Sequence, residues 1–112
     1  MAKFEVTLHK DFDRLLHLIE EEIVDSSMSA TLEDSSDFVS GGARCSVRVF
    51  ERYSMMGGNR LSLSVTLFQN GTDDIHLSAI AAGGSQGVLF KVNTFGEEAF
   101  LEELRELVCP ED

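Results

Sequence analysis

The chain has 112 residues, 43% of them apolar, and a net charge of −11 from 20 acidic and 9 basic side chains. This length and composition predict a single α+β domain over residues 1–112 and exclude a disordered chain. The acidic balance argues against nucleic-acid binding, because phosphates repel such a surface. No apolar stretch is long enough for a membrane span, and MAKFEVTLHK lacks the apolar middle of a secretory signal, so a cytoplasmic protein is expected.

The N-terminal part of the chain is predicted to form a strand and then a helix. Residues 3–9, KFEVTLH, are assigned to the first strand, and Asp11 stands at the N-cap position of the helix. The helix has an apolar stripe at helical spacing, made of Phe12, Leu15, Leu16, Ile19 and Ile23. A second strand is expected to begin near Ser29, in SATLED, whereas the following SSDFVS is too polar to assign as regular strand.

Apolar residues recur at every second position between residues 43 and 92, which is typical of antiparallel strands with one buried face. The predicted strands there are 43–53, 60–68, 74–82 and 88–92 (VLFKV). In 43–53 the residues expected to face the core are Cys45, Val47 and Val49. Those expected to face outward are Arg44, Ser46, Arg48, Phe50 and Arg52, and, from the following strands, Ser62, Ser64, Thr66, Phe68, His76, Ser78 and Ile80.

Glycine-bearing junctions separate these strands, at residues 41–42, 57–58, 70–71 and 83–84. Tight hairpin turns need positive φ angles, which glycine adopts without a steric cost. The segment GGSQG, residues 83–87, is therefore interpreted as a turn. A phosphate-binding loop would lead into a helix and would carry a lysine followed by serine or threonine.

The last element is predicted to be a helix over NTFGEEAFLEELRELV, residues 93–108, with Thr94 and Glu97 as a capping box. Its buried stripe would consist of Phe95, Phe100, Leu104, Leu107 and Val108. One apolar stripe on each helix and one apolar face on the sheet favour an α+β two-layer sandwich. We expect an antiparallel sheet of five to six strands with both helices on one face, in the order β-α-β-β-β-β-(β)-α.

Several stretches, LEDSSDF, ERYS with GGNRLSLSVTL, SAIAAGGSQG and NTFGEEAFLEELRE, together resemble a family of short uncharacterised bacterial proteins, mostly from Firmicutes, that is catalogued as a domain of unknown function. The resemblance covers nearly the whole chain. It implies an intact single-domain protein, and it carries over no activity, ligand or catalytic residue. The order of elements is also similar to helix-on-sheet folds of the TATA-binding-protein or helix-grip type, a likeness that assigns no function.

Candidate catalytic and metal sites are incomplete in the sequence. Asp13 and His17 are four residues apart on the first helix, but a transition-metal site needs three or four ligands, and no further histidine or cysteine is placed to complete it. The serines Ser64, Ser78 and Ser85 lie in no G-x-S-x-G motif. We therefore predict no catalytic, metal or cofactor-binding residues.

The outward face of the predicted sheet is the candidate interaction surface, because arginine and aromatic side chains are enriched in interfaces. The alternative is that these arginines form ordinary ion pairs with acids on neighbouring strands. The candidate residues are Arg44, Arg48, Phe50, Arg52, Arg60, Ser64, Phe68 and His76.

These observations favour a non-enzymatic cytoplasmic binding or assembly module that uses its open sheet face or a free edge strand and forms a homodimer, the commonest oligomer. An acidic partner or a peptide would suit the predicted sheet face. Two alternatives remain open. One is a small-molecule carrier with a pocket between helices and sheet, lined by Phe12, Phe90 and Phe100. The other is a small enzyme that works through His76 and nearby serines or arginines.

Overall fold

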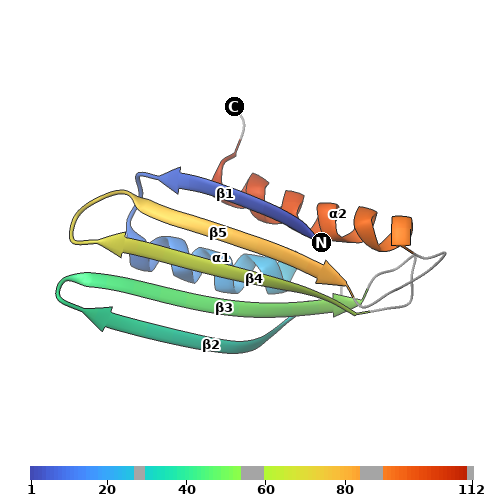
Figure 1. Ribbon diagram of the computed structural model, residues 1–112, viewed down its shortest axis with the longest axis horizontal. Helices are drawn as coiled ribbons and strands as arrows, with labels where there is room; N and C mark the ends of the chain where they lie inside the picture. Colours follow the sequence, from blue (N-terminus) through green and yellow to red (C-terminus); the bar gives the residue numbers. More distant parts are fainter. Residues whose placement is uncertain (27–29, 54–59, 84–89, 111–112) are drawn as a thin grey trace.

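The fold consists of a five-stranded antiparallel sheet and two helices, and the computed structural model describes residues 1–26, 30–53, 60–83 and 90–110 (Figure 1). The elements, in chain order, are β1 (Ala2–Leu8), α1 (Phe12–Ser26), β2 (Thr31–Ser40), β3 (Ala43–Tyr53), β4 (Arg60–Asn70), β5 (Ile75–Gly83) and α2 (Phe90–Val108). This order and the antiparallel pairing confirm the predicted α+β class.

The strand order in the sheet is β1-β5-β4-β3-β2, so β1 and β2 form its two edges. Strands β2 to β5 are a meander, in which each strand pairs with the next one along the chain. The turn between β2 and β3 consists of Gly41 and Gly42, with φ angles of 56° and 90°, and Gly71 after β4 has a φ of 65°. These angles strain any residue with a side chain. Two of the predicted glycine junctions are thus confirmed, and the other two fall at least partly outside the described residues.

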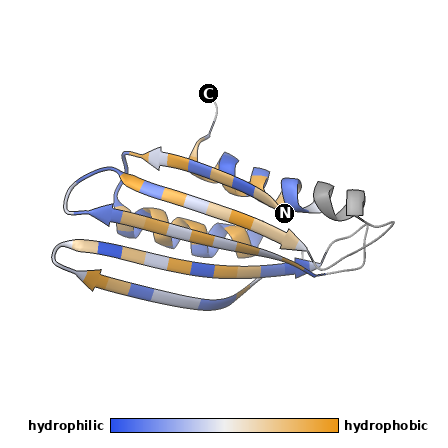
Figure 2. Cartoon of the chain, viewed as in Figure 1, coloured by the Kyte–Doolittle hydropathy of each residue, from blue (hydrophilic) through white to orange (hydrophobic). Residues whose placement is uncertain are grey.

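Both helices cover the same face of the sheet, and the core lies between the two layers (Figure 1). Helix α1 begins as predicted, because Oδ2 of Asp11 accepts a hydrogen bond from the backbone N–H of Arg14 at 3.0 Å. Figure 2 shows hydrophobic and hydrophilic residues alternating along the strands. The buried residues of α1, β4, β5 and α2 include Phe12, Leu15, Ile19, Ile23, Leu61, Leu63, Val65, Leu67, Ile75, Leu77, Phe100, Leu104 and Val108.

The predicted orientation of β3 is wrong, although its alternation is real. Phe50 has an exposed fraction of 0% and Arg48 of 6%, so both lie on the helix side of the sheet. The pairing register explains why: Phe50 lies opposite Leu63, and Arg48 lies opposite Val65, both of which are core residues of β4. Arg44, Ser46 and Arg52 share that side, whereas Cys45, Val47 and Val49, predicted to be inward, point away from the helices.

The segments at the two ends of the sheet also differ from the prediction. The polar SSDFVS is part of β2, which pairs with β3 from Thr31 to Ser40 with one irregularity between Leu32 and Asp34. Helix α2 begins at Phe90, so residues 90–92 of VLFKV are helical and Thr94 lies within the helix instead of at its cap. A short apolar run has no period that distinguishes a strand from a buried helix.

The connection from β5 to α2 therefore leads from a strand into a helix, and not into a further strand as predicted. Residues 84–89, which include most of GGSQG, lie outside the described residues.

Among the described residues of α2, Glu97 is buried, and its Oε1 lies 2.6 Å from the terminal ammonium group of Met1.

We expect two truncations in β3 to distinguish its faces. Phe50→Ala should lower the free energy of unfolding by about 3–4 kcal/mol, because it empties a closed part of the core. Val49→Ala, on the other side of the strand, should lower it by less than about 1 kcal/mol. Urea denaturation followed by circular dichroism measures both values, and equal losses would contradict the orientation of β3 described above.

Candidate functional site

Three of the arginines predicted to face outward, Arg44, Arg48 and Arg52, lie instead between the sheet and the helices, where each forms an ion pair with a helix carboxylate. Arg44 forms an ion pair of 2.8 Å with Asp13 of α1, and its guanidinium lies 3.9 Å from the centre of the Phe12 ring. The terminal nitrogen of Arg52 lies 2.7 Å from Glu103 of α2. The guanidinium of Arg52 lies 4.2 Å from the centre of the Phe100 ring. Aromatic rings attract such cations, so Arg44 and Arg52 are held by both charge and packing.

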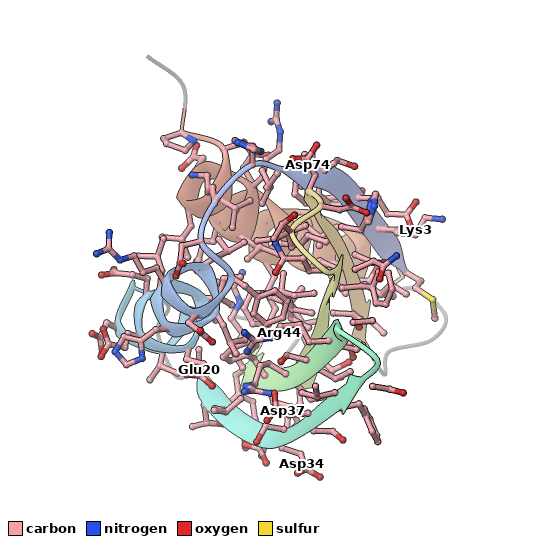
Figure 3. The ribbon with its side chains drawn as sticks, turned by 90° about the vertical axis from the view of Figure 1, so that its left-hand side faces the viewer. Lys3, Glu20, Asp34, Asp37, Arg44 and Asp74 are labelled. Carbon is pink, nitrogen blue, oxygen red and sulfur yellow. The ribbon has the colours of Figure 1, made fainter. Side chains whose placement is uncertain are left out.

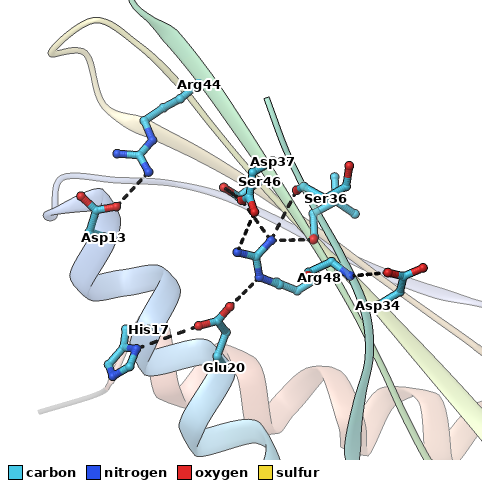
Figure 4. Close-up of polar contacts among 11 residues, drawn as sticks. Asp13, His17, Glu20, Asp34, Ser36, Asp37, Arg44, Ser46 and Arg48 are labelled. Atoms are coloured by element: carbon cyan, nitrogen blue, oxygen red, sulfur yellow. Dashed lines mark hydrogen bonds and ion pairs between the residues drawn. The ribbon is translucent and has the colours of Figure 1, made fainter. Parts of the chain in front are cut away.

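Arg48 is the most buried of these arginines and joins three elements (Figure 4). Its Nε donates a hydrogen bond of 2.6 Å to Glu20 of α1, and its terminal nitrogens lie 3.1 and 3.3 Å from the carboxylate of Asp37 on β2. It also donates to the backbone oxygen of Val47 at 2.9 Å. The hydroxyl of Ser46 donates a further bond of 2.6 Å to Asp37. Figure 3 shows Glu20 and Asp37 together on the side of the sheet that α1 covers.

The contacts within this cluster favour the charged forms of Asp37 and Arg48. The hydrogen bond from Ser46 and the guanidinium of Arg48 hold the pKa of Asp37 below its usual value of 3.8. Burial alone would lower the pKa of Arg48, but its hydrogen bonds to Glu20 and Asp37 raise it instead. The cluster is therefore a fixed ionic link between α1, β2 and β3, and its arginine is not available to an outside partner.

The opposite side of the sheet, which we call the outer face, carries no helix in the described part of the chain (Figure 1). Five successively paired residues, one from each strand, form what we call the cross-strand row: Phe38, Cys45, Phe68, His76 and Thr7. The exposed fraction is 64% for Phe38 and 42% for Phe68. The ring of His76 stacks beside that of Phe68, with centroids 6.4 Å apart.

A shallow groove of about 470 Å³ runs over the β1, β5 and β4 part of the outer face. Its polar groups include Glu5, Ser78 and the pair formed by Oγ1 of Thr7 and Nδ1 of His76, 3.3 Å apart. Within the described residues, His76 is hydrogen-bonded to Thr7 and no serine hydroxyl bonds to it. The enzyme hypothesis also invoked arginines near His76. Arg44, Arg48 and Arg52 instead form ion pairs with helix carboxylates on the other side of the sheet.

The outer face is nearly neutral, in contrast to the chain as a whole. Its side chains include two bases, Lys3 and Arg60, against four acids, Glu5, Glu33, Asp34 and Glu51, of which Glu33 lies 3.7 Å from Arg60. The two helices carry ten acidic and three basic residues. The negative charge of the protein is therefore concentrated in the helix layer, away from the outer face.

The predicted interaction residues are thus divided between two sides of the sheet. Ser64, Phe68 and His76 lie on the outer face as expected. Arg60 lies at one end of this face, 2.7 Å from Glu51. The placement predicted for Arg44, Arg48, Phe50 and Arg52 is wrong, because all four face the helices.

Sequence reasoning missed Phe38, because it lies in the polar segment that was not assigned to a strand. The hairpin turn at Gly41 and Gly42 could have revealed it. A tight turn there requires the residues before it, Phe38 among them, to form a strand that pairs with β3. Of the residues proposed to line a carrier pocket, Phe12 and Phe100 are packed in the core. The side chain of Phe90 lies outside the described residues.

A protein-family model described as "Family of unknown function (DUF6054)" matches residues 1–109. The chain belongs to this family. No curated protein and no solved structure matches this DUF6054 protein. Because the matched region contains all five strands and both helices, the outer face and the arginine cluster both lie within the family domain.

The described residues also bear on metal binding and on membrane insertion. In the described ranges, no group of three or more histidine, cysteine, aspartate or glutamate side chains is arranged to hold a metal ion. Neither helix, over its described residues, is long and apolar enough to cross a bilayer.

We expect removal of the central arginine to destabilise the protein. Arg48→Met should lower the free energy of unfolding by about 2 kcal/mol, because Glu20 and Asp37 lose their cation. The loss should fall below the roughly 3–5 kcal/mol of a fully buried pair, since both acids reach solvent. The triple variant Arg48→Met, Glu20→Gln, Asp37→Asn should recover part of it. Urea denaturation measures these differences, and a triple variant less stable than Arg48→Met would contradict the ionic account.

The lowered pKa of Asp37 predicts a specific dependence of stability on pH. A carboxylate with a lower pKa in the folded state stabilises the protein above its unfolded pKa of about 3.9, and this stabilisation is lost as the pH falls through the folded value. Wild-type should therefore lose more stability than Asp37→Asn between about pH 5 and pH 3. An NMR titration should place the Asp37 midpoint below 3.8 in wild-type and higher in Ser46→Ala. A midpoint unchanged by Ser46→Ala would refute the assigned cause.

Proposed function

We propose that this DUF6054 protein is a non-enzymatic binding module that assembles with a second copy of itself through the outer face. The observation that carries the proposal is the cross-strand row, which exposes Phe38 and Phe68 on a nearly neutral face of a strongly acidic chain. Exposed apolar patches of this kind mark interaction sites, because exposure of large aromatic rings to water is unfavourable and a partner can bury them.

The distribution of charge favours a second copy as the partner. Two chains with a charge of −11 each repel one another in most orientations. Packing outer face against outer face keeps the acidic helices on the far sides and brings together the surfaces with the least charge. Two sheets packed in this way lie about 10 Å apart, and side chains such as Phe68 interdigitate between them.

The size of the outer face is also sufficient for a dimer. Five strands spaced about 4.8 Å apart, with about ten residues at 3.3 Å each, give a face of roughly 800 Å². A standard protein interface takes about 800 Å² from each partner. A two-fold arrangement would use the same face on both chains, as closed dimers do.

We expect sedimentation equilibrium to give a mass of twice 12.4 kDa for the wild-type protein. Phe68→Glu should weaken dimerisation about tenfold or more, because it places a charge in the apolar part of the cross-strand row. Val39→Glu is the matched control, since it adds the same charge at an exposed residue that lies on the helix side of β2. Added salt, up to about 0.5 M, should strengthen the dimer by screening the repulsion between the acidic chains.

Two results would overturn this function. One is a wild-type mass of 12.4 kDa at all accessible concentrations. The other is a dimer that Val39→Glu weakens as much as Phe68→Glu, which would place the contact elsewhere.

A further inference from the structure

Strand β2 presents a second surface that the proposed dimer does not explain. It is one of the two edges of the sheet, it is ten residues long, and each of its residues is exposed (Figure 1). An edge strand has a row of unpaired backbone N–H and C=O groups along its free side, which another extended segment can bind.

The side chains of β2 restrict which segment can bind there. On the outer face, Asp34, Ser36 and Phe38 alternate along the strand, so an acidic residue and an aromatic residue share one side four positions apart. Figure 3 shows Asp34 on the side of β2 away from Glu20 and α1. Within the described part of the chain, its Oδ1 accepts a local hydrogen bond from the backbone N–H of Ser35 at 2.8 Å.

A depression of about 240 Å³ lies next to Asp34 on the same face. Val47 and Val49 of β3 form its apolar floor, and Ser35 and Ser36 complete its lining together with Asp34. A lysine or arginine side chain fits this chemistry, because its methylene groups can cover the valines while its charge reaches the carboxylate.

We propose that β2 binds an extended basic peptide segment, which adds to the sheet as a sixth, antiparallel strand. Antiparallel addition places the residue opposite Phe38 before the residue opposite Asp34. The segment therefore has an apolar side chain followed four positions later by lysine or arginine, both on the same side. The charge of −11 on the protein attracts such a segment over a long range.

A second copy of the chain is a poorer occupant of this edge. Glu33, Asp34 and Asp37 would bring six carboxylates into one pair of β2 strands, and like charges directly opposite each other destabilise a sheet. The same acids attract a basic strand.

This inference goes beyond the proposed dimer, and the two surfaces overlap. Val47 and Val49 belong to the outer face, so a bound segment and a second copy exclude each other there. The bound segment would therefore shift the protein toward monomers. Self-association and peptide binding also have opposite salt dependences, since salt screens repulsion in the first case and attraction in the second.

The experiment uses a fluorescein-labelled ten-residue peptide of alternating valine and threonine, with phenylalanine at the third position and lysine at the seventh. Fluorescence anisotropy measures its binding to the full chain. A peptide with glutamate in place of lysine should bind about tenfold more weakly. A third peptide, N-methylated at alternate backbone amides, should lose binding because it cannot form the strand hydrogen bonds.

The matched protein variants are Asp34→Lys and Asp73→Lys, which make the same change in charge. Asp73 is an exposed acid in the turn after β4, which adjoins the β2–β3 turn and not the part of β2 that contains Asp34. Asp34→Lys should weaken binding of the lysine peptide about tenfold and improve binding of the glutamate peptide, whereas Asp73→Lys should change either affinity less than about twofold.

Three results would overturn the inference: no saturable binding up to about 1 mM, equal affinities for the lysine and glutamate peptides, or equal effects of Asp34→Lys and Asp73→Lys. Full binding of the N-methylated peptide would exclude strand addition as its mode. Phe68→Glu separates the two proposals, because this variant should bind the lysine peptide at least as well as wild-type even if no dimer is ever observed.

Discussion

The arrangement of the whole molecule depends on the neutralisation of the β3 arginines by helix carboxylates. Phe50 and Arg48 are on the same side of β3, so burial of the aromatic ring forces the guanidinium beneath α1 as well. An unpaired charge there would cost several kcal/mol. Glu20 on α1 and Asp37 on β2 remove this cost and thereby fix α1 over one end of the sheet. The acidic composition of the helices is thus partly a structural requirement of the strand below them.

This internal pairing also determines which surface remains for partners. Because Arg44, Arg48 and Arg52 are directed to the helices, the middle of the outer face of β3 consists of Cys45, Val47 and Val49. The surplus of acids stays on the helix layer. One side of the protein is therefore strongly negative and the other nearly neutral, and this separation follows from the orientation of a single strand. The proposed dimer and the proposed peptide site both depend on it.

Much of this fold was predictable from local patterns, and the failures have physical causes. The period of two located β3, β4 and β5, Asp11 located the start of α1, and glycines located turns. The same period does not say which side of β3 is buried, since hydropathy alone favours the valines over a side with three arginines. The missing information lies in another element: Asp13 and Glu20 are about 10 Å apart along a helix, close to the roughly 13 Å between Arg44 and Arg48 along a strand. The VLFKV segment failed because five residues are too few to show a period.

The Arg48 cluster also bears on how well β2 can receive another strand. An isolated edge strand with every side chain exposed has little burial to hold it in place. Arg48 and Ser46 bind Asp37 at the middle of β2, and the ladder to β3 extends on both sides of that point. The free edge is therefore held in an extended conformation before any partner arrives. A segment that adds to it has to order only its own backbone, which lowers the entropic cost of binding. The buried cation that fixes the helix layer thus also holds the edge to which the proposed segment would add.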